Sequence, residues 1–567
     1  MDGQTLIEQI RDAVIGAGEA VCGPFGRRRV TYADYTASGQ SLSFIEDYIR
    51  EAVLPLYANT HTESSGTGLQ TTRFREEARR IIRDAVGGTD QHCVIFCGSG
   101  STAAVDKLIG VLNLRIPRDL DARYDLSSRI PAGERPVVFI GPYEHHSNEL
   151  PWRESIADVV VIHEDLNGGI DLDDLETQLR RHAHRPLKIG SFSAASNVTG
   201  IVSDTRAVSI LLHRFGALSF WDFAAAAPYV RIRMGPTGEA GDDALDYRDA
   251  IFLSPHKLIG GPGTPGVLVA RRELFRNSVP VVPGGGTVSY VNPEEHRYLR
   301  DPEHREEGGT PAIVESIRAG LVFRLKQAVS EDLIREREES FIRRAIASWQ
   351  QNPNIEILGN CTAERLSIVS FVVRHEGAGR YLHHNYVVAL LNDLFGIQSR
   401  GGCSCAGPYG HRLLGIDLER SHEFEREIAR GCEGIKPGWV RVNFNYFISE
   451  TVFQYVLDAV HLAATDGWRL LHAYDFEPST GLWRHRKGTA EPPMSLHDVR
   501  YAADGVTWEH RRRHEPESRL PEYIEEAKRI FREAADDDGV PPHHDLSADF
   551  EHLRWFPLPY EVPAIRR

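Results

Sequence analysis

Short apolar runs alternate with helical patterns between about residues 90 and 270. Apolar residues are consecutive within each run, which is typical of strands buried on both faces. Between the runs, Val105, Leu108 and Leu112 have helical spacing, and Ser203 is predicted to cap a later helix. This alternation predicts a mostly parallel sheet with helices on both faces. The predicted strands are 94–96, 137–140, 159–162, 189–192, 218–220, 250–253 and 266–269.

The pattern changes from about residue 285. A long helical stretch (315–350) precedes an apolar strand (366–373), and further helix and strand follow, which predicts a smaller α+β domain. The last hundred or so residues are rich in Arg, Glu, His and Pro, and they include one predicted helix at 521–535. Their large aromatic residues favour an ordered appendage over a disordered tail. These are Trp483, Trp508, Trp555 and Phe556.

The predicted class is α/β, with a large domain, a smaller α+β domain and a C-terminal extension. We place a helical N-terminal arm at 1–30, the large domain at 31–285, the smaller domain at 286–465, and the extension, of unknown role, at 466–567. A chain of 567 residues is long enough for more than one domain.

Composition narrows the class of protein. The net charge of −15 argues against a nucleic-acid partner or an anionic membrane. No apolar run is long enough to span a bilayer, and the N-terminal residues have neither the basic nor the apolar part of a signal peptide. Seven cysteines, odd in number and widely scattered, fit a reducing cytoplasm better than a disulfide framework.

Chemically active side chains follow the predicted strands. Lys257 lies in Ser254-Pro255-His256-Lys257, directly after one strand, and Asp222 ends another. A lysine that bonds to a carbonyl, an acid that holds a ring-nitrogen proton, and hydroxyl and imidazole donors are what pyridoxal 5'-phosphate (PLP) requires. Ligands of parallel sheets bind beyond the carboxyl ends of the strands. We therefore expect one crevice to collect Ser101, His145, Asn197, Asp222 and Lys257.

Each of these residues also has a purely structural interpretation. Gly-Ser turns before helices are common, so residues 98–102 alone are a weak phosphate signal. The pair His145-His146 could bind a metal, stack on a cofactor or lie in a surface turn, but no third ligand at a recognised spacing predicts a metal site. Asp222 could cap a helix, and Lys257 could be solvated. Their order on successive strand ends favours the PLP interpretation.

The same segments carry a family resemblance. As an ordered set they resemble the class V aminotransferase family of PLP enzymes, which has PLP fold type I. Within it they are most similar to cysteine desulfurases, selenocysteine lyases and the desulfurase-like part of molybdenum-cofactor sulfurases. The resemblance covers about residues 30–465. It rests on 32–38 (YADYTAS), 100–102 (GST), 144–152 (EHHSNELPW), 196–200 (SNVTG), Asp222 and 254–257 (SPHK).

The resemblance implies a role for each residue. Lys257 would form the internal aldimine and move the Cα proton, while Asp222 would keep the pyridine nitrogen protonated. His145 would stack on the ring and assist proton transfer, and Asn197 would contact cofactor or substrate. A homodimer is implied as well, because one phosphate ligand would come from a second subunit. The phosphate-binding residues would be Ser101, Thr102, Ser254, His256 and, from that subunit, Thr310.

The resemblance also implies how substrate and sulfur are handled. Arg441 would bind the substrate carboxylate in bidentate fashion, with Arg400 as a second candidate. Cys405 falls where the desulfurases carry a persulfide, although Cys403 is two residues away and could carry the sulfur instead. A nearby arginine can lower a thiol pKa. The two cysteines could alternatively be half of a metal site, a redox pair or inert packing residues. Ala225 stands where the desulfurases usually have a Gln that touches the pyridoxal ring oxygen.

The predicted function is therefore a cytoplasmic, PLP-dependent cysteine desulfurase or C–S lyase that acts on L-cysteine or a related amino acid. A sulfur-acceptor protein would be its partner. One alternative is an aminotransferase, epimerase or β-eliminating lyase without thiol chemistry, which Ala225 favours. The other is a non-catalytic scaffold or sulfur carrier, against which Lys257 and Asp222 argue.

Overall fold

The computed structural model describes residues 3–60, 62–375, 380–488, 494–508, 513–534 and 546–561. Two compact units are present, and each is described by itself. Unit 1 comprises Met1–Ile15, Thr36–Arg337 and Thr362–Leu366, and unit 2 comprises Gly16–Tyr35, Glu338–Cys361 and Ser367–Arg567. Residues 286–337 thus group with unit 1 and the last hundred or so with unit 2, while the predicted four-part division stays a prediction.

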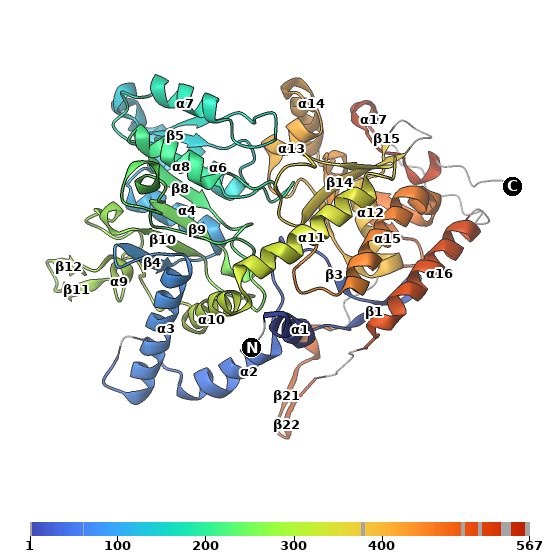
Figure 1. Ribbon diagram of the computed structural model, residues 1–567, viewed down its shortest axis with the longest axis horizontal. Helices are drawn as coiled ribbons and strands as arrows, with labels where there is room; N and C mark the ends of the chain where they lie inside the picture. Colours follow the sequence, from blue (N-terminus) through green and yellow to red (C-terminus); the bar gives the residue numbers. More distant parts are fainter. Residues whose placement is uncertain are drawn as a thin grey trace. The chain divides into compact units, whose positions relative to one another are not determined.

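Unit 1 contains a seven-stranded sheet in the part of it that is described, which confirms the predicted α/β class (Figure 1). The strand order is β4-β10-β9-β8-β7-β5-β6. Only β10 runs against its neighbours β4 and β9, so the other six strands share one direction. The strands are β4 (His92–Phe96), β5 (Val137–Ile140), β6 (Asp158–Val161), β7 (Lys188–Ser193), β8 (Leu218–Asp222), β9 (Ala250–Leu253) and β10 (Val267–Arg271).

Helices cover both faces of this sheet. On one face α4 (Gly100–Val111) and α6 (His146–Arg153) pack against the strands, with Val105 and Trp152 in the shared core. On the other face α8 (Thr205–Arg214) lies so close that a Cβ at Gly190 would stand 2.5 Å from Leu212. The consecutive apolar residues of the central strands are accordingly buried. Strand β6 differs from the prediction because it lies at the sheet edge and is partly exposed.

Two local predictions for unit 1 require correction. Asp204, not Ser203, caps α8, since its carboxylate accepts the backbone N–H of Ala207 at 2.9 Å. The predicted helical stretch over 315–350 is interrupted once, at Ser330 with φ of 82°, which separates α10 (Ile313–Val329) from α11 (Glu331–Trp349); residues of α11 from Glu338 onward belong to unit 2. The remaining elements are α1 (Gly3–Ala13), α2 (Ser43–Tyr48), α3 (Gly66–Ala85), α5 (Arg118–Tyr124), α7 (Leu172–Arg181), α9 (Pro302–Arg305), β11 (Val288–Val291) and β12 (His296–Tyr298).

Unit 2 is built on a smaller antiparallel sheet. Its order is β13-β14-β18-β17, with β15 paired to β14. The strands are β13 (Ile355–Ile357), β14 (Ile368–His375), β15 (Arg380–Tyr381), β17 (Arg400–Gly402) and β18 (Trp439–Asn443). A short parallel pair joins β3 (Thr31–Tyr32) to β16 (Ile397–Gln398). The helices are α12 (His384–Phe395), α13 (Gly407–Leu413), α14 (Leu418–Ala429), α15 (Glu450–Asp466), α16 (Leu520–Glu533) and α17 (Ala548–Leu553).

The C-terminal extension shares the core of unit 2. Trp483, Tyr523 and Phe556 are buried in the same apolar cluster as Trp349 and Phe371. Trp508 differs from Trp483 and Phe556, because it is half exposed. Hairpins complete the unit: β1 (Ala20–Gly23) with β2 (Gly26–Arg29), β19 (Tyr474–Glu477) with β20 (Leu482–His485), and β21 (Arg500–Ala502) with β22 (Gly505–Thr507). In the described residues, helices fall short of the length and apolarity that crossing a bilayer demands.

Candidate active site

The carboxyl ends of five parallel strands in unit 1 carry the predicted cofactor residues. Ser101 follows β4, His145 follows β5, and Asn197 follows β7. Asp222 is the last residue of β8, and Lys257 follows β9. Because these strands share one direction, their carboxyl ends lie along the same edge of the sheet.

The first turn of α4 meets the residues that follow β9. The hydroxyl of Ser254 accepts the backbone N–H of Ser101 at 2.9 Å. Gly100 has φ of 55°, and a Cβ there would stand 3.0 Å from Ser254 Oγ and 3.7 Å from His256 Nε2. Backbone amides at a helix N-terminus, a hydroxyl and an imidazole therefore lie together, which is a donor set suited to a phosphate group. Thr102 is exposed, and its hydroxyl lies 2.6 Å from that of Ser147.

Asp222 is almost fully buried, at 4% exposure. Burial raises the pKa of its carboxyl group, opposed by the hydrogen bond from Ala224 N–H at 2.8 Å and by the charge of Lys257. The residues that follow form turns rather than a helix, so Asp222 is not a helix cap. A buried carboxylate of this kind gains most from a cationic or protonated partner. Ala225, three positions after Asp222 in the chain, is buried as well.

The protonation of His256 and the tautomer of His145 follow from their surroundings. Burial, together with the charge of Lys257, lowers the pKa of His256 to about 4, so the ring is neutral at neutral pH. His145 is the N-cap of α6, where its Nδ1 accepts the backbone N–H of Ser147 at 3.1 Å. Because Nδ1 is an acceptor, the proton of a neutral His145 ring belongs on Nε2.

Glu144 is a buried acid that the sequence analysis did not single out. Its Oε1 accepts the backbone N–H groups of Gly141 (3.1 Å) and Ser193 (2.8 Å), and its Oε2 accepts Asn148 Nδ2 (2.7 Å) and the Ser193 hydroxyl (2.6 Å). This carboxyl group thus joins the loop after β5, the end of β7 and the first turn of α6. Burial raises the pKa of the Glu144 carboxyl group to about 7, although the hydrogen bonds from Ser193 and Asn148 lower it. Its place directly before His145 was the only signal in the sequence.

Unit 2 brings together the predicted substrate and sulfur residues. Arg441 is 3% exposed, and its guanidinium donates to Asp34 Oδ1 at 2.8 Å. Burial lowers the Arg441 pKa, while the charges of Asp34 and Cys405 raise it and that of Arg400 lowers it. Arg400 is paired with Arg441 across β17 and β18. Asp34 was part of the 32–38 motif, but its pairing with Arg441 was not foreseen.

The cysteine loop follows β17 directly and has an unusual backbone. Ser404 and Cys405 have φ values of 51° and 58°, a left-handed conformation that costs non-glycine residues about 1 kcal/mol each. Cys403 is exposed, whereas Cys405 is half-buried. Cys405 is therefore the more sheltered of the two cysteines, and it lies near enough to Arg441 to affect its pKa.

The predictions for Thr310 and for a metal centre concern other parts of the structure. Thr310 is exposed in unit 1, where Asn59 Nδ2 donates to its hydroxyl at 3.4 Å, and its reach into a second subunit stays a prediction. As for a metal centre, the described ranges hold no group of three or more His, Cys, Asp or Glu side chains that could bind a metal ion.

Comparisons with known proteins point to one family. In fold, this chain is similar to the apo cysteine desulfurase of Thermococcus onnurineus NA1, with a TM-score of 0.60 at 22% identity, over 77% of this chain and 94% of that one. The cysteine desulfurase CsdA of Escherichia coli gives a TM-score of 0.57 at 20% identity, over 76% and 93%. These identities establish similarity of fold alone.

Among curated relatives, a probable cysteine desulfurase of Halalkalibacterium halodurans is 25% identical over 387 residues, which is 67% of this chain and 84% of the relative. Probable cysteine desulfurase 2 of Mycobacterium leprae is 29% identical over 401 residues, or 68% and 85%. The family model for aminotransferase class V matches residues 31–418, so it includes every strand of the unit 1 sheet and the cysteine loop. The chain therefore belongs to the class-V aminotransferase family.

Proposed function

We propose that this protein is a PLP-dependent cysteine desulfurase that releases sulfur from L-cysteine or a closely related amino acid. The observation that carries the proposal is the pairing of two residue sets in one chain. Unit 1 has a lysine, a buried acid and phosphate donors on neighbouring strand ends, and unit 2 has a sheltered cysteine near a buried arginine. Relatives of this chain are named cysteine desulfurases.

The residues of unit 1 fit PLP chemically. The Ser254 hydroxyl, the His256 imidazole and the first turn of α4 form a donor set for the phosphate. Asp222 is a buried carboxyl group whose pKa is raised by burial, so it gains from the proton of a protonated ring nitrogen. Lys257 supplies the amine that would bond to the cofactor's aldehyde. When bound, PLP withdraws electrons from the bonds at the amino acid's Cα.

Around such a cofactor the chain's own residues have separate tasks. Asp222 would hold the proton on the ring nitrogen. His145, fixed as the N-cap of α6 with a proton on Nε2, would donate from that atom. Lys257 would move the proton at Cα. Asn197 would contact the cofactor or the substrate.

Sulfur transfer would use the residues of unit 2. Arg441 would bind the substrate carboxylate, and Asp34 would fix the orientation of its guanidinium. The Cys405 thiolate would attack the substrate sulfur, so that an S–S bond forms and the substrate's C–S bond breaks. The electron pair of that C–S bond stays with the substrate carbon, which takes up protons and leaves as alanine. The persulfide would then pass to an acceptor thiol on another protein. We propose further that the enzyme is a cytoplasmic homodimer.

The test compares Cys405→Ala with Cys403→Ala in purified, PLP-loaded protein. We expect Cys405→Ala to lose alanine and sulfide production from L-cysteine with dithiothreitol present, while its cofactor absorbance stays unchanged. Cys403→Ala should keep most of the activity, and mass spectrometry of the loop peptide should place the extra sulfur on Cys405. Full activity in Cys405→Ala contradicts the proposal.

One observation favours a second candidate. Ala225 is buried, and it offers no side-chain donor at the place where desulfurases usually have a Gln. An aminotransferase, epimerase or β-eliminating lyase of the same family would need no thiol. Formation of pyruvate or of a keto acid from the amino acid, with unchanged rates in both cysteine variants, would identify this second activity.

A further inference from the structure

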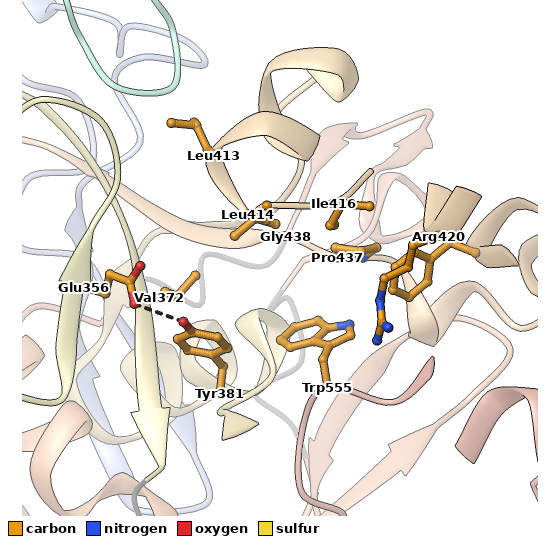
Figure 2. A pocket seen from close by; sticks show the side chains of 12 residues that line it. Glu356, Val372, Tyr381, Leu413, Leu414, Ile416, Arg420, Pro437, Gly438 and Trp555 are labelled. Atoms are coloured by element: carbon orange, nitrogen blue, oxygen red, sulfur yellow. Dashed lines mark hydrogen bonds between the residues drawn. The ribbon is translucent and has the colours of Figure 1, made fainter. Parts of the chain in front are cut away.

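A cavity of about 420 Å³ in unit 2 takes no part in the proposed reaction. Strands β13–β15, the connection from α13 to α14, and the C-terminal extension all contribute to its walls (Figure 2). The family match ends at residue 418, so five of the residues that line the cavity lie outside it: Arg420, Phe424, Pro437, Gly438 and Trp555. Leu413, Leu414 and Ile416 form an aliphatic side of the cavity.

Two aromatic rings face this aliphatic side and are held in place. Figure 2 shows Tyr381 and Trp555 across the cavity from Leu413 and Leu414. Trp555 donates from Nε1 to the carbonyl of Ile435 at 3.1 Å, and its ring stacks on His383 with a centroid distance of 5.2 Å and an interplanar angle of 17°. The Tyr381 hydroxyl donates to Glu356 at 2.9 Å. The aromatic wall is therefore formed before any ligand binds.

The charges that line the cavity do not balance. Glu356 is already neutralised, because Arg374 donates two hydrogen bonds to it, at 2.6 and 2.9 Å. Arg420 is different: its guanidinium lies over the Phe424 ring, 5.7 Å from the centroid. Within the described part of the chain, no carboxylate pairs with the Arg420 side chain. Arg420 and Trp555 line the same cavity, and Figure 2 draws both side chains. The cavity thus has among its lining residues one exposed cation, stacked on an aromatic ring, that has no carboxylate partner in the described residues.

We infer that this cavity binds a small amphipathic anion, with an aromatic or branched apolar body and one carboxylate. Its volume lies in the range of roughly 300–1,000 Å³ that is usual for small-molecule sites. The apolar body would replace water between the leucines and the two rings. The carboxylate would pair with Arg420, whose planar guanidinium is suited to bidentate contacts. Neither group is needed for PLP or for cysteine, so the inference is independent of the proposed function.

The cavity also adjoins the segments on either side of the cysteine loop. Leu413 is the last residue of α13, which begins two residues after Cys405. Gly438 packs so tightly that a Cβ there would stand 2.7 Å from the Cα of Gly402, the residue before Cys403. A bound anion would therefore contact the structure that supports this loop.

The test uses two fluorescent probes with similar apolar bodies. The first, 8-anilinonaphthalene-1-sulfonate, is anionic, and the second, N-phenyl-1-naphthylamine, is neutral. We expect the full-length protein to bind both at a single saturable site. Arg420→Gln should weaken the anionic probe about tenfold, as expected for loss of a charged hydrogen bond, and leave the neutral probe unchanged. Arg426→Gln, on the same helix but outside the cavity, is the matched control and should change neither.

A cavity-filling variant and a pair of competing ligands test the same site independently. Leu414→Trp fills the cavity and should weaken both probes, whereas 3-phenylpropionate should displace the anionic probe much better than 3-phenylpropanamide. Retention of the neutral probe by Arg420→Gln shows that this variant is folded. The inference is overturned if Arg420→Gln and Arg426→Gln bind the anionic probe equally, if Leu414→Trp binds it like the wild type, or if acid and amide compete equally.

Discussion

Replacing Glu144 by Gln should remove a pH dependence of stability that this one carboxyl group creates. The side chain is buried with its two oxygens engaged by Ser193, Asn148 and Gly141. Burial raises its pKa from the ordinary value of 4.5 to about 7. The folded protein therefore holds this proton more tightly than the unfolded chain does.

The sign and size follow from that shift. Below pH 4.5 the group is mostly protonated in both the folded and the unfolded state, so it does not reduce the free energy of unfolding. Between pH 4.5 and 7 the unfolded chain releases the proton first, so the free energy of unfolding decreases as the pH rises. The loss is complete about one pH unit above the folded-state pKa of about 7. A shift of this size corresponds to roughly 3 kcal/mol, most of which is lost between pH 5 and 8.

The assay is urea unfolding of the wild type and of Glu144→Gln at several pH values from 5 to 8. Other titrating groups act in both proteins, so the difference between the two isolates Glu144. We expect the wild type to lose roughly 2–3 kcal/mol more than the variant over this range. Glu149→Gln, which removes a buried carboxylate paired with Arg153 on the same helix, is the control. Parallel curves for the wild type and Glu144→Gln refute the reasoning.

Two other predictions come from the geometry of each unit. Gly266→Ala would place a Cβ 1.9 Å from the carbonyl oxygen of Gly100, so we expect the free energy of unfolding to fall by about 3 kcal/mol or more and PLP binding to weaken. The control is Gly98→Ala, whose added Cβ would have its nearest contact at an ordinary 3.6 Å. Equal melting temperatures of the two variants would contradict the prediction. Arg441→Lys keeps the positive charge but loses the two parallel N–H donors of the guanidinium, so we expect KM for L-cysteine to rise about tenfold with a smaller change in kcat. An unchanged KM in steady-state assays would show that Arg441 does not bind the substrate.

Much of unit 1 could be predicted because its signals are local. A buried strand needs consecutive apolar residues, and β5 and β9 begin and end where those residues do. The residues at the strand ends follow from the same signal, since parallel strands bring their carboxyl ends to one edge. Edge position is not local, so the burial of β6 was predicted incorrectly. The cap of α8 was misplaced by one residue because Ser203 and Asp204 are both good caps, and the backbone geometry chose between them.

The sequence by itself indicated the family, the order of the strands along the chain, and the residues whose chemistry suits PLP. Tertiary structure decided which of those residues have partners. Asp34 and Arg441 are 407 positions apart, and no periodicity along the chain connects them. Glu144 became an unusual acid only when burial removed its water. Arg420 became notable only once Trp555, from the far end of the chain, closed a cavity beside it. Burial and charge pairing depend on distances in space, which a local sequence pattern does not encode.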